Sequence, residues 1–246
     1  QALDEAVRAN IIPCNPTAGT VVPKPDRRPK PILNDAQLET FMEAIRQDEL
    51  WYDFFYTELT TGLRRGEICG LQWQDFDPEA GTLKISRTLH CPKVGEYTTG
   101  DTKTGKGRHT IILPKSTADL LRERQKTAQS EWIFPNPLDP KLPTAPQTAY
   151  SHLKTILKQA GLPNIRFHGL RHTFATHSLA SGVDAKTLSG ILGHTNASFT
   201  LDTYTQVTTD MQKQASDIVG DFMENIFGKE LKPWQENASP ATAPSA

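Results

Sequence analysis

The chain has 246 residues, with 27 Lys and Arg against 28 Asp and Glu, a formal net charge of −1 and 37% hydrophobic residues. This apolar fraction excludes a wholly disordered protein, and the length is sufficient for one sizeable hydrophobic core. No apolar run approaches the roughly 20 residues that cross a bilayer, and no secretory signal pattern is visible. We therefore expect no membrane association.

The three cysteines are Cys14, Cys69 and Cys91, an odd number without CxxC spacing. This pattern argues against a disulfide framework or a thiolate zinc site and fits a reducing, cytoplasmic environment. Charge is unevenly distributed: residues 61–194 carry a net charge of +7, whereas 1–60 and 195–246 each carry −4. A basic middle segment is compatible with a surface that binds a polyanion; a mixed, solvated surface is the alternative.

Residues 1–12 have the pattern of the end of a helix, and because the chain begins at Gln1 inside this pattern we expect a fragment of a longer protein. Residues 13–33 are rich in proline, which opposes helix formation, and are predicted to be an interdomain linker. Asn34 is a good helix N-cap before apolar residues at helical spacing.

Beyond this first helix, segments with a helical pattern of apolar residues alternate with segments that have an extended, strand-like pattern. Residues 82–86 and 108–113 are strand candidates, with glycine-rich turns between them. Residues 135–146 are predicted to form a proline-rich loop, and the polar tail 229–246 is predicted to be disordered. Further helices are predicted at about 50–59, 64–73, 116–129, 147–160, 168–181, 184–192 and 208–227. The predicted fold class is mainly α with a small antiparallel β-sheet (α+β).

Four short segments carry side chains capable of chemistry. They are TGLRRGE at 61–67, TKTG at 102–105, HGLRH at 168–172, and LGH at 192–194 with Tyr204 ten residues later. Each has an ordinary structural interpretation by itself. An arginine at a helix start caps the helix or faces solvent, a lysine in a glycine-rich turn is solvated, and a tyrosine between threonines packs.

A metal site is one alternative for the histidines. His168 and His172 are four residues apart and would share a helical face, but the glutamate of an HExxH motif is absent. Arg171 lies between them and would repel a cation. A metal-dependent hydrolase built on His168, His172 and His177 remains an alternative, and it would lose activity with a chelator.

In this order, the segments resemble the tyrosine recombinase (phage integrase) family, especially integrases of conjugative transposons, over about residues 31–227. The resemblance implies a tyrosine recombinase catalytic domain at 34–228 with a C-terminal helix, preceded at 1–12 by the end of a truncated core-binding domain. The family's amino-terminal arm-binding region would be absent. The implied activity is site-specific DNA recombination through a 3′-phosphotyrosine intermediate, without metal or cofactor, for integration or excision of a mobile element. A type IB topoisomerase and a catalytically silent sequence-specific DNA-binding protein are alternatives.

The resemblance also implies catalytic roles residue by residue. Arginine suits phosphate because its planar guanidinium donates two parallel hydrogen bonds and keeps its charge, and a tyrosine nucleophile needs activation because its reference pKa is about 10. The implied set is Tyr204 as nucleophile, His168 as general base, Arg64 and Arg171 on the non-bridging oxygens, Lys103 as general acid and His194 as phosphate donor.

The implied partners are double-stranded DNA and further copies of the chain, from dimer to tetramer, in the bacterial cytoplasm. An apolar stripe at 218–227 must be buried against something. The resemblance suggests that this terminal helix is exchanged between protomers; packing on its own domain is the alternative. Glu67, three residues after Arg64, is expected either to orient that guanidinium or to favour the helix N-terminus.

Overall fold

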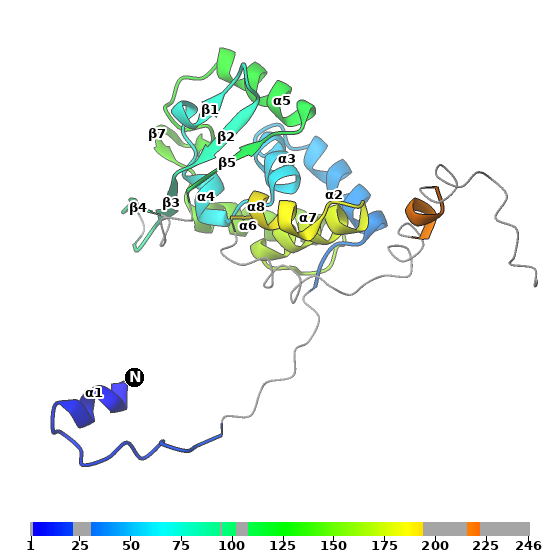
Figure 1. The fold of residues 1–246 in the computed structure, drawn as a ribbon. Helices are drawn as coiled ribbons and strands as arrows, with labels where there is room; N and C mark the ends of the chain where they lie inside the picture. Colours follow the sequence, from blue (N-terminus) through cyan, green and yellow to red (C-terminus); the bar gives the residue numbers. More distant parts are fainter. Residues whose placement is uncertain (1, 22–30, 94, 102–107, 194–215, 222–246) are drawn as a thin grey trace, which may run out of the picture. The chain divides into compact units, whose positions relative to one another are not determined.

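The computed structural model describes residues 2–21, 31–93, 95–101, 108–193 and 216–221 (Figure 1). The chain divides into two compact units, Gln1–Lys30 and Pro31–Ala246, which are described separately. In the first unit, α1 (Ala2–Arg8) contains no buried residue. The predicted helix at 1–12 is therefore present but ends at Arg8, two residues before Asn10, whose φ of 55° is left-handed.

The second unit contains most of the described secondary structure. Its elements are α2 (Asp35–Arg46), α3 (Tyr52–Thr61), α4 (Arg65–Cys69), the 3-10 helix η1 (Trp73–Asp75), β1 (Phe76–Asp77), β2 (Thr82–Ile85), β3 (Arg87–His90), β4 (Thr98–Asp101), β5 (His109–Ile112), α5 (Lys115–Lys126), β6 (Pro135–Asn136), β7 (Asp139–Pro143), α6 (Pro146–Gln159), α7 (Phe167–Ala180) and α8 (Ala185–Ile191). Residues 216–221 are also helical, within the predicted helix 208–227. The rest of that prediction and the tail 229–246 lie outside the described residues. Helices with small antiparallel sheets confirm the predicted fold class.

The N-terminus of α2 confirms the predicted cap. The backbone N–H of Gln37 donates to Asn34 Oδ1 at 2.9 Å, and the Asn34 N–H donates to Gln37 Oε1 at 3.1 Å. This reciprocal capping box satisfies two backbone donors at the start of the helix. The helix predicted at 64–73 is wrong at its end, because α4 stops at Cys69. Beyond it, Gln72 forms an antiparallel bridge with Trp132.

In the described residues, the strands form three small antiparallel sheets, ordered β1-β2-β5, β3-β4 and β6-β7. The predicted strands correspond to β2 and β5, which pair directly with Leu83 opposite Ile111. The proline-rich segment 135–146 was predicted to be a loop, and this is wrong over β6 and β7. Its prolines at 135 and 143 pair with one another at the end of the ladder, where a missing N–H is tolerated.

The hydrophobic core joins the helices to the sheet. Figure 1 shows α3, α6, α7 and α8 together on one side of the β1-β2-β5 sheet. Phe54 packs edge-to-face on Phe55 and Phe134, with ring centroids 5.2 Å apart in both pairs. A second buried cluster, Ala175, Leu179, Leu188 and Leu192, joins α7 to α8. None of the helices in the described ranges is long and apolar enough to cross a membrane.

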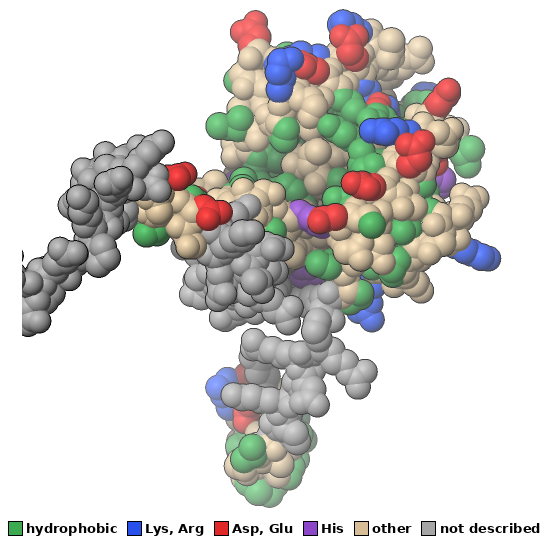
Figure 2. Space-filling model, turned by 90° about the vertical axis from the view of Figure 1, so that its right-hand side faces the viewer, with side chains coloured by type: hydrophobic (Ala, Val, Ile, Leu, Met, Phe, Trp, Pro, Cys, Tyr) green, Lys and Arg blue, Asp and Glu red, His purple; other side chains and the backbone are tan. Residues whose placement is uncertain are grey.

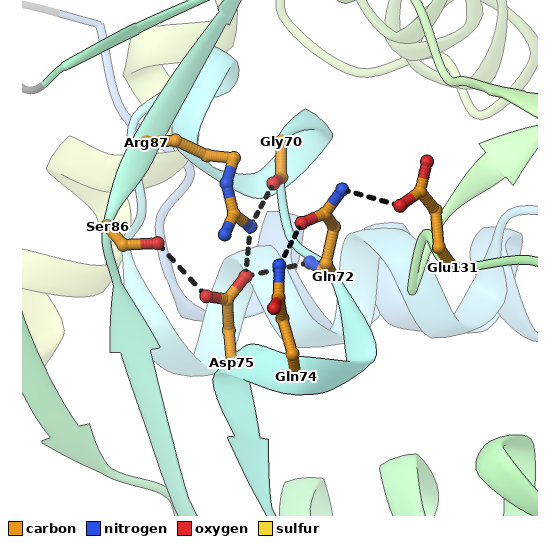
Figure 3. A network of polar contacts seen from close by, with 7 residues as sticks. All are labelled: Gly70, Gln72, Gln74, Asp75, Ser86, Arg87 and Glu131. Carbon is orange, nitrogen blue, oxygen red and sulfur yellow. Dashed lines mark hydrogen bonds and ion pairs between the residues drawn. The ribbon is translucent and has the colours of Figure 1, made fainter.

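A buried carboxylate holds the start of β3 against η1. Asp75 is 6% exposed and accepts hydrogen bonds from the Ser86 hydroxyl at 3.0 Å and the Gln72 backbone N–H at 2.9 Å. Arg87 forms an ion pair with the same carboxylate and also donates to the Gly70 carbonyl oxygen (Figure 3). This network ties β3 to the end of α4, and β3 in turn pairs with β4.

We predict that Gly66→Ala destabilises the protein, because Gly66 of α4 lies directly against β3. A Cβ at this position would lie 2.6 Å from Thr88 Cγ2 and 2.8 Å from the Leu89 carbonyl oxygen. The expected loss in free energy of unfolding is about 1–3 kcal/mol, measured by urea denaturation. Gly190→Ala in α8 is the matched control, because nothing lies within 4 Å of its added Cβ. This control should stabilise the protein by about 0.5–1 kcal/mol, and an equal loss in both variants would contradict the packing explanation.

Candidate functional site

Arg171 of α7 belongs to the HGLRH segment and connects it to two of the other three sequence segments. Its side chain is almost completely buried, with 1% exposed. Nη1 donates to the Gly62 carbonyl oxygen and Nη2 donates to the Leu192 carbonyl oxygen, both at 2.7 Å. Gly62 and Leu192 are the C-cap residues of α3 and α8. Because helix C-termini carry partial negative charge, the guanidinium is bound where two such termini meet.

Gly62 permits this arrangement through its conformation and its lack of a side chain. Its φ of 60° is left-handed, which ends α3. A Cβ here would lie 2.3 Å from Phe174 Cδ1 of α7 and 3.1 Å from Leu192 Cδ2. Glycine therefore lets the turn after α3 pack closely on both α7 and α8.

Arg64 is the N-cap residue of α4 and lies two residues after Gly62. Its backbone N–H donates to Glu67 Oε2 at 2.9 Å, and its Nη1 donates to Glu67 Oε1 at 2.7 Å. The Glu67 side chain is 2% exposed, whereas that of Arg64 is 41% exposed. Glu67 therefore both caps the helix and orients the Arg64 guanidinium. Both of the roles expected for it apply. The neighbouring Arg65 points elsewhere, with its guanidinium 5.7 Å from the centroid of the Tyr150 ring.

The histidines of α7 divide into two groups. His168 is exposed, His172 is 4% exposed, and their rings meet edge-to-face with centroids 4.5 Å apart, so they share a helical face as predicted. His177 instead has Nε2 3.0 Å from the Leu33 carbonyl oxygen and Nδ1 3.1 Å from Asp35 Oδ1. Both of its ring nitrogens are thus engaged with the start of α2, which argues against the three-histidine metal site. The described part of the chain contains no group of three or more His, Cys, Asp or Glu suited to a metal.

The segment after α8 packs on β5. Gly193 has φ of 60°, and an added Cβ would lie 2.6 Å from the His109 ring. His109 Nε2 lies 3.0 Å from the Ile191 carbonyl oxygen. The sequence pattern does not single out His109, because only its place in the strand candidate 108–113 marks it. This contact brings the residues before His194 next to the strand that follows Lys103 in the chain.

Of the six predicted catalytic residues, the structure describes Arg64, His168 and Arg171. Arg171 contacts the turn that leads to Arg64, and His168 precedes Arg171 on the same helix. Lys103, His194 and Tyr204 lie outside the described residues, so their convergence with the other three stays a prediction.

Charged side chains on the drawn face of the molecule are mixed. Figure 2 shows Lys and Arg side chains interspersed with Asp and Glu and with hydrophobic side chains. That face therefore carries no patch of a single charge sign. The charged side chains of Glu58, Glu67 and Arg171 are instead buried in the interior.

Two titratable groups, Glu58 and Cys69, are fully buried in the core. Burial raises the pKa of the Glu58 carboxyl well above its ordinary 4.5, Arg171 opposes this rise, and Glu67 adds to it. Burial is also the main cause of the raised pKa of the Cys69 thiol, with a smaller contribution from Glu58. A buried, protonated thiol is a poor nucleophile, so Cys69 is a core residue. Nothing in the sequence pattern identified Glu58, which precedes the TGLRRGE segment.

Comparison with known proteins gives consistent matches. The profile of the phage integrase family matches residues 31–211. The ICEBs1 integrase of Bacillus subtilis is 28% identical over 89% of this chain and 62% of its own length. A XerC-like tyrosine recombinase of Caldanaerobacter subterraneus is 28% identical over 77% of this chain and 54% of its own length. The chain thus spans about half to two thirds of the length of these relatives.

Among solved structures, the Tn1549 transposon integrase in complex with a circular intermediate DNA matches with a TM-score of 0.75. It is 25% identical, and the match covers 89% of this chain and 75% of that one. A lambda integrase dimer bound to a core site matches with a TM-score of 0.60 at 22% identity, over 83% of this chain and 57% of that one. The latter likeness concerns the fold.

We predict that Glu58→Gln changes how stability depends on pH. The folded-state pKa of Glu58 is raised above its ordinary 4.5, so its contribution to stability is fully present below pH 4.5 and is lost as pH rises through the folded pKa. Glutamine does not ionise, so urea denaturation between about pH 5 and about pH 8 should show the variant gaining stability relative to the unsubstituted protein as pH rises. Glu39→Gln, at an exposed position on α2, is the control and should show no such trend. A stability difference that is constant with pH for Glu58→Gln would contradict the burial argument.

Proposed function

The chain belongs to the phage integrase family, and from this membership we propose that it is a site-specific tyrosine recombinase. It cleaves and rejoins DNA strands to integrate or excise a mobile element. Its relatives include the ICEBs1 integrase of Bacillus subtilis and the Tn1549 transposon integrase. The likeness covers the residues that carry the motifs, because the family match extends over 31–211.

The observation that best supports the proposal is the pair of hydrogen bonds from Arg171. They join HGLRH to the turn of TGLRRGE and to the residues just before His194, although 109 and 21 residues separate the bonded partners. A phosphodiester bound there would have Arg64 on one side, with its guanidinium oriented by Glu67. Positive donors in a largely water-excluded site stabilise the charge that develops in the transition state of phosphoryl transfer.

In the proposed cleavage step, the Tyr204 phenolic oxygen attacks the scissile phosphorus and its proton passes to His168. A bond forms between the tyrosine oxygen and the 3′-phosphate while the bond to the 5′-oxygen breaks. Lys103 supplies the proton that the leaving 5′-oxygen takes up, and His194 donates a hydrogen bond to the phosphate. Attack by a 5′-hydroxyl of a partner strand on the phosphotyrosine reverses the sequence and rejoins DNA, so no hydrolysis takes place.

The proposed partners are double-stranded DNA at the element ends and target, and further copies of the chain. Lambda integrase has been solved as a dimer on a core site and as a tetramer on a Holliday junction. In the helix at 216–221, Ile218 and Val219 are 69% and 60% exposed. This supports exchange of the terminal helix between protomers. As an enzyme acting on DNA of a mobile element, the protein is proposed to work in the bacterial cytoplasm.

We predict that Tyr204→Phe abolishes the covalent adduct with DNA while leaving binding nearly unchanged, because the variant lacks only the attacking oxygen. The substrate is a nicked duplex carrying an end of the element that encodes the chain, which traps the adduct once the short strand diffuses away. The unsubstituted protein should form an adduct that survives SDS and maps to Tyr204, with and without EDTA. An adduct formed by the variant would refute the nucleophile, and no adduct with the unsubstituted protein would refute the proposed function.

We predict that Arg171→Lys lowers the cleavage rate by more than about 100-fold while changing DNA affinity by less than about tenfold. Lysine keeps the charge but loses the planar pair of donors. Arg65→Lys is the matched control, because Arg65 faces Tyr150, and it should cleave at a rate close to that of the unsubstituted protein. Thermal melting checks that both variants fold. Equal losses of cleavage and binding in Arg171→Lys would show that Arg171 serves only to hold DNA or the fold.

A further inference from the structure

His109 is a half-buried histidine at the start of β5 that has no role in the mechanism given above. Its Nε2 lies 3.0 Å from the carbonyl oxygen of Ile191, the last residue of α8. A carbonyl oxygen only accepts hydrogen bonds, so His109 is the donor through Nε2. The ring also lies beside Gly193, where an added Cβ would be 2.6 Å from its Cε1 atom. His109 thus contacts the end of α8 both by a hydrogen bond and by packing.

The C-terminus of α8 is held by side chains from two other elements. A helix leaves its last carbonyl oxygens without a donor of its own. At α8, His109 of β5 binds the Ile191 carbonyl, and Arg171 of α7 binds the next one, that of Leu192, at 2.7 Å. Because the direction of a carbonyl follows the backbone dihedral angles, these two bonds fix the backbone immediately before His194.

The two sides of the His109 contact differ in how firmly they are held. β5 pairs with β2, where Ile85 lies opposite His109, and the neighbouring Ile85 and Ile111 are 0% and 3% exposed in the core. The helix α8 has only 7 residues, which is too short for stability without tertiary contacts. Loss of the hydrogen bond would therefore release the end of α8 and leave the strand in place.

We propose that His109 is a positioning residue for the recombination reaction, which holds the end of α8 so that His194 donates to the scissile phosphate. It acts through His194 and not by its own contact with the reacting atoms. This inference rests on the proposed function, because it uses the phosphate-binding role proposed for His194. Arg171 binds the same helix end but is also proposed to bind the phosphate, so His109 is the residue at which positioning can be tested alone.

Two amide substitutions separate the hydrogen bond from the bulk of the ring. Glutamine carries its amide nitrogen as many bonds from Cα as Nε2 of histidine, whereas asparagine carries it at the place of Nδ1. His109→Gln should therefore keep the bond to Ile191 and cleave within about threefold of the unsubstituted rate. His109→Asn should cleave at least about tenfold more slowly, because a small displacement of a group that acts on the transition state is costly.

Cleavage is measured as single-turnover formation of the covalent adduct on the nicked element-end duplex. DNA affinity is measured by fluorescence anisotropy, and thermal melting checks that each variant folds. Both variants should bind DNA within about threefold of the unsubstituted protein, because they keep every phosphate-binding cation. Equal cleavage rates for His109→Gln and His109→Asn would overturn the proposal, and so would a loss of affinity as large as the loss of rate. His109→Ala takes the place of His109→Asn if the latter does not fold.

A double-mutant cycle tests whether His109 acts through His194. In a His194→Ala background, His109→Asn should lower the cleavage rate by less than about twofold, because the group that it positions is already absent. The same fold-loss in both backgrounds would show that His109 acts on something else, and the inference would be wrong.

A modified substrate tests the other neighbour of His109, the strand that follows Lys103 in the chain. A duplex with sulfur in place of the scissile 5′-oxygen has a leaving group that departs without a proton, so it bypasses the general acid. His109→Asn should lose as much rate on this duplex as on the ordinary one. Recovery on the sulfur substrate would place the effect at Lys103 and overturn the inference. The proposed function fails separately, because it is decided by whether the unsubstituted protein forms an adduct at Tyr204.

Discussion

The structure of the candidate site depends on one buried cation bound to two helix ends. Arg171 donates to carbonyl oxygens at the C-termini of α3 and α8. At each terminus a carbonyl that the helix itself leaves unpaired accepts a strong, charge-assisted hydrogen bond. Because α3 leads to Arg64 and α8 leads to His194, the position of this guanidinium sets the geometry of both segments.

The cation reaches these carbonyls because two glycines let backbone segments approach closely. Gly62 and Gly193 both have left-handed φ angles and both lie against an aromatic ring, Phe174 and His109 respectively. A side chain at either position would meet both a backbone strain and a steric clash. The glycines in TGLR and LGH thus have a packing reason that is independent of any reaction.

The two arginines of the site have different environments. Arg64 is half exposed and held on one side by Glu67, whereas Arg171 is interior and bound by backbone. An exposed cation is partly screened by water, but a buried one acts through a low dielectric and its field extends further. This explains why an acid such as Glu58, in the core and distant in sequence from Arg171, is coupled to the site.

Features that depend on neighbours in the chain were predictable from the sequence. The N-cap at Asn34 and the shared face of His168 and His172 follow from local geometry and helical periodicity. The family likeness was predictable for the same reason, because its motifs are short and contiguous. The early end of α4 and the β6-β7 hairpin were not, because pairing with Trp132 and between two proline-containing strands overrides local propensity.

Contacts between residues far apart were decided only by the tertiary structure. No local pattern indicates that Arg171 binds Gly62, that His109 meets the end of α8, or that Glu58 is buried with no hydrogen-bond donor in the described part of the chain. The hydrophobic pattern specifies which face of each helix is buried, but the partner on that face depends on how all the elements pack together. The chemistry of the site therefore follows from residue types that the sequence displays, and its electrostatics from burial that only packing creates.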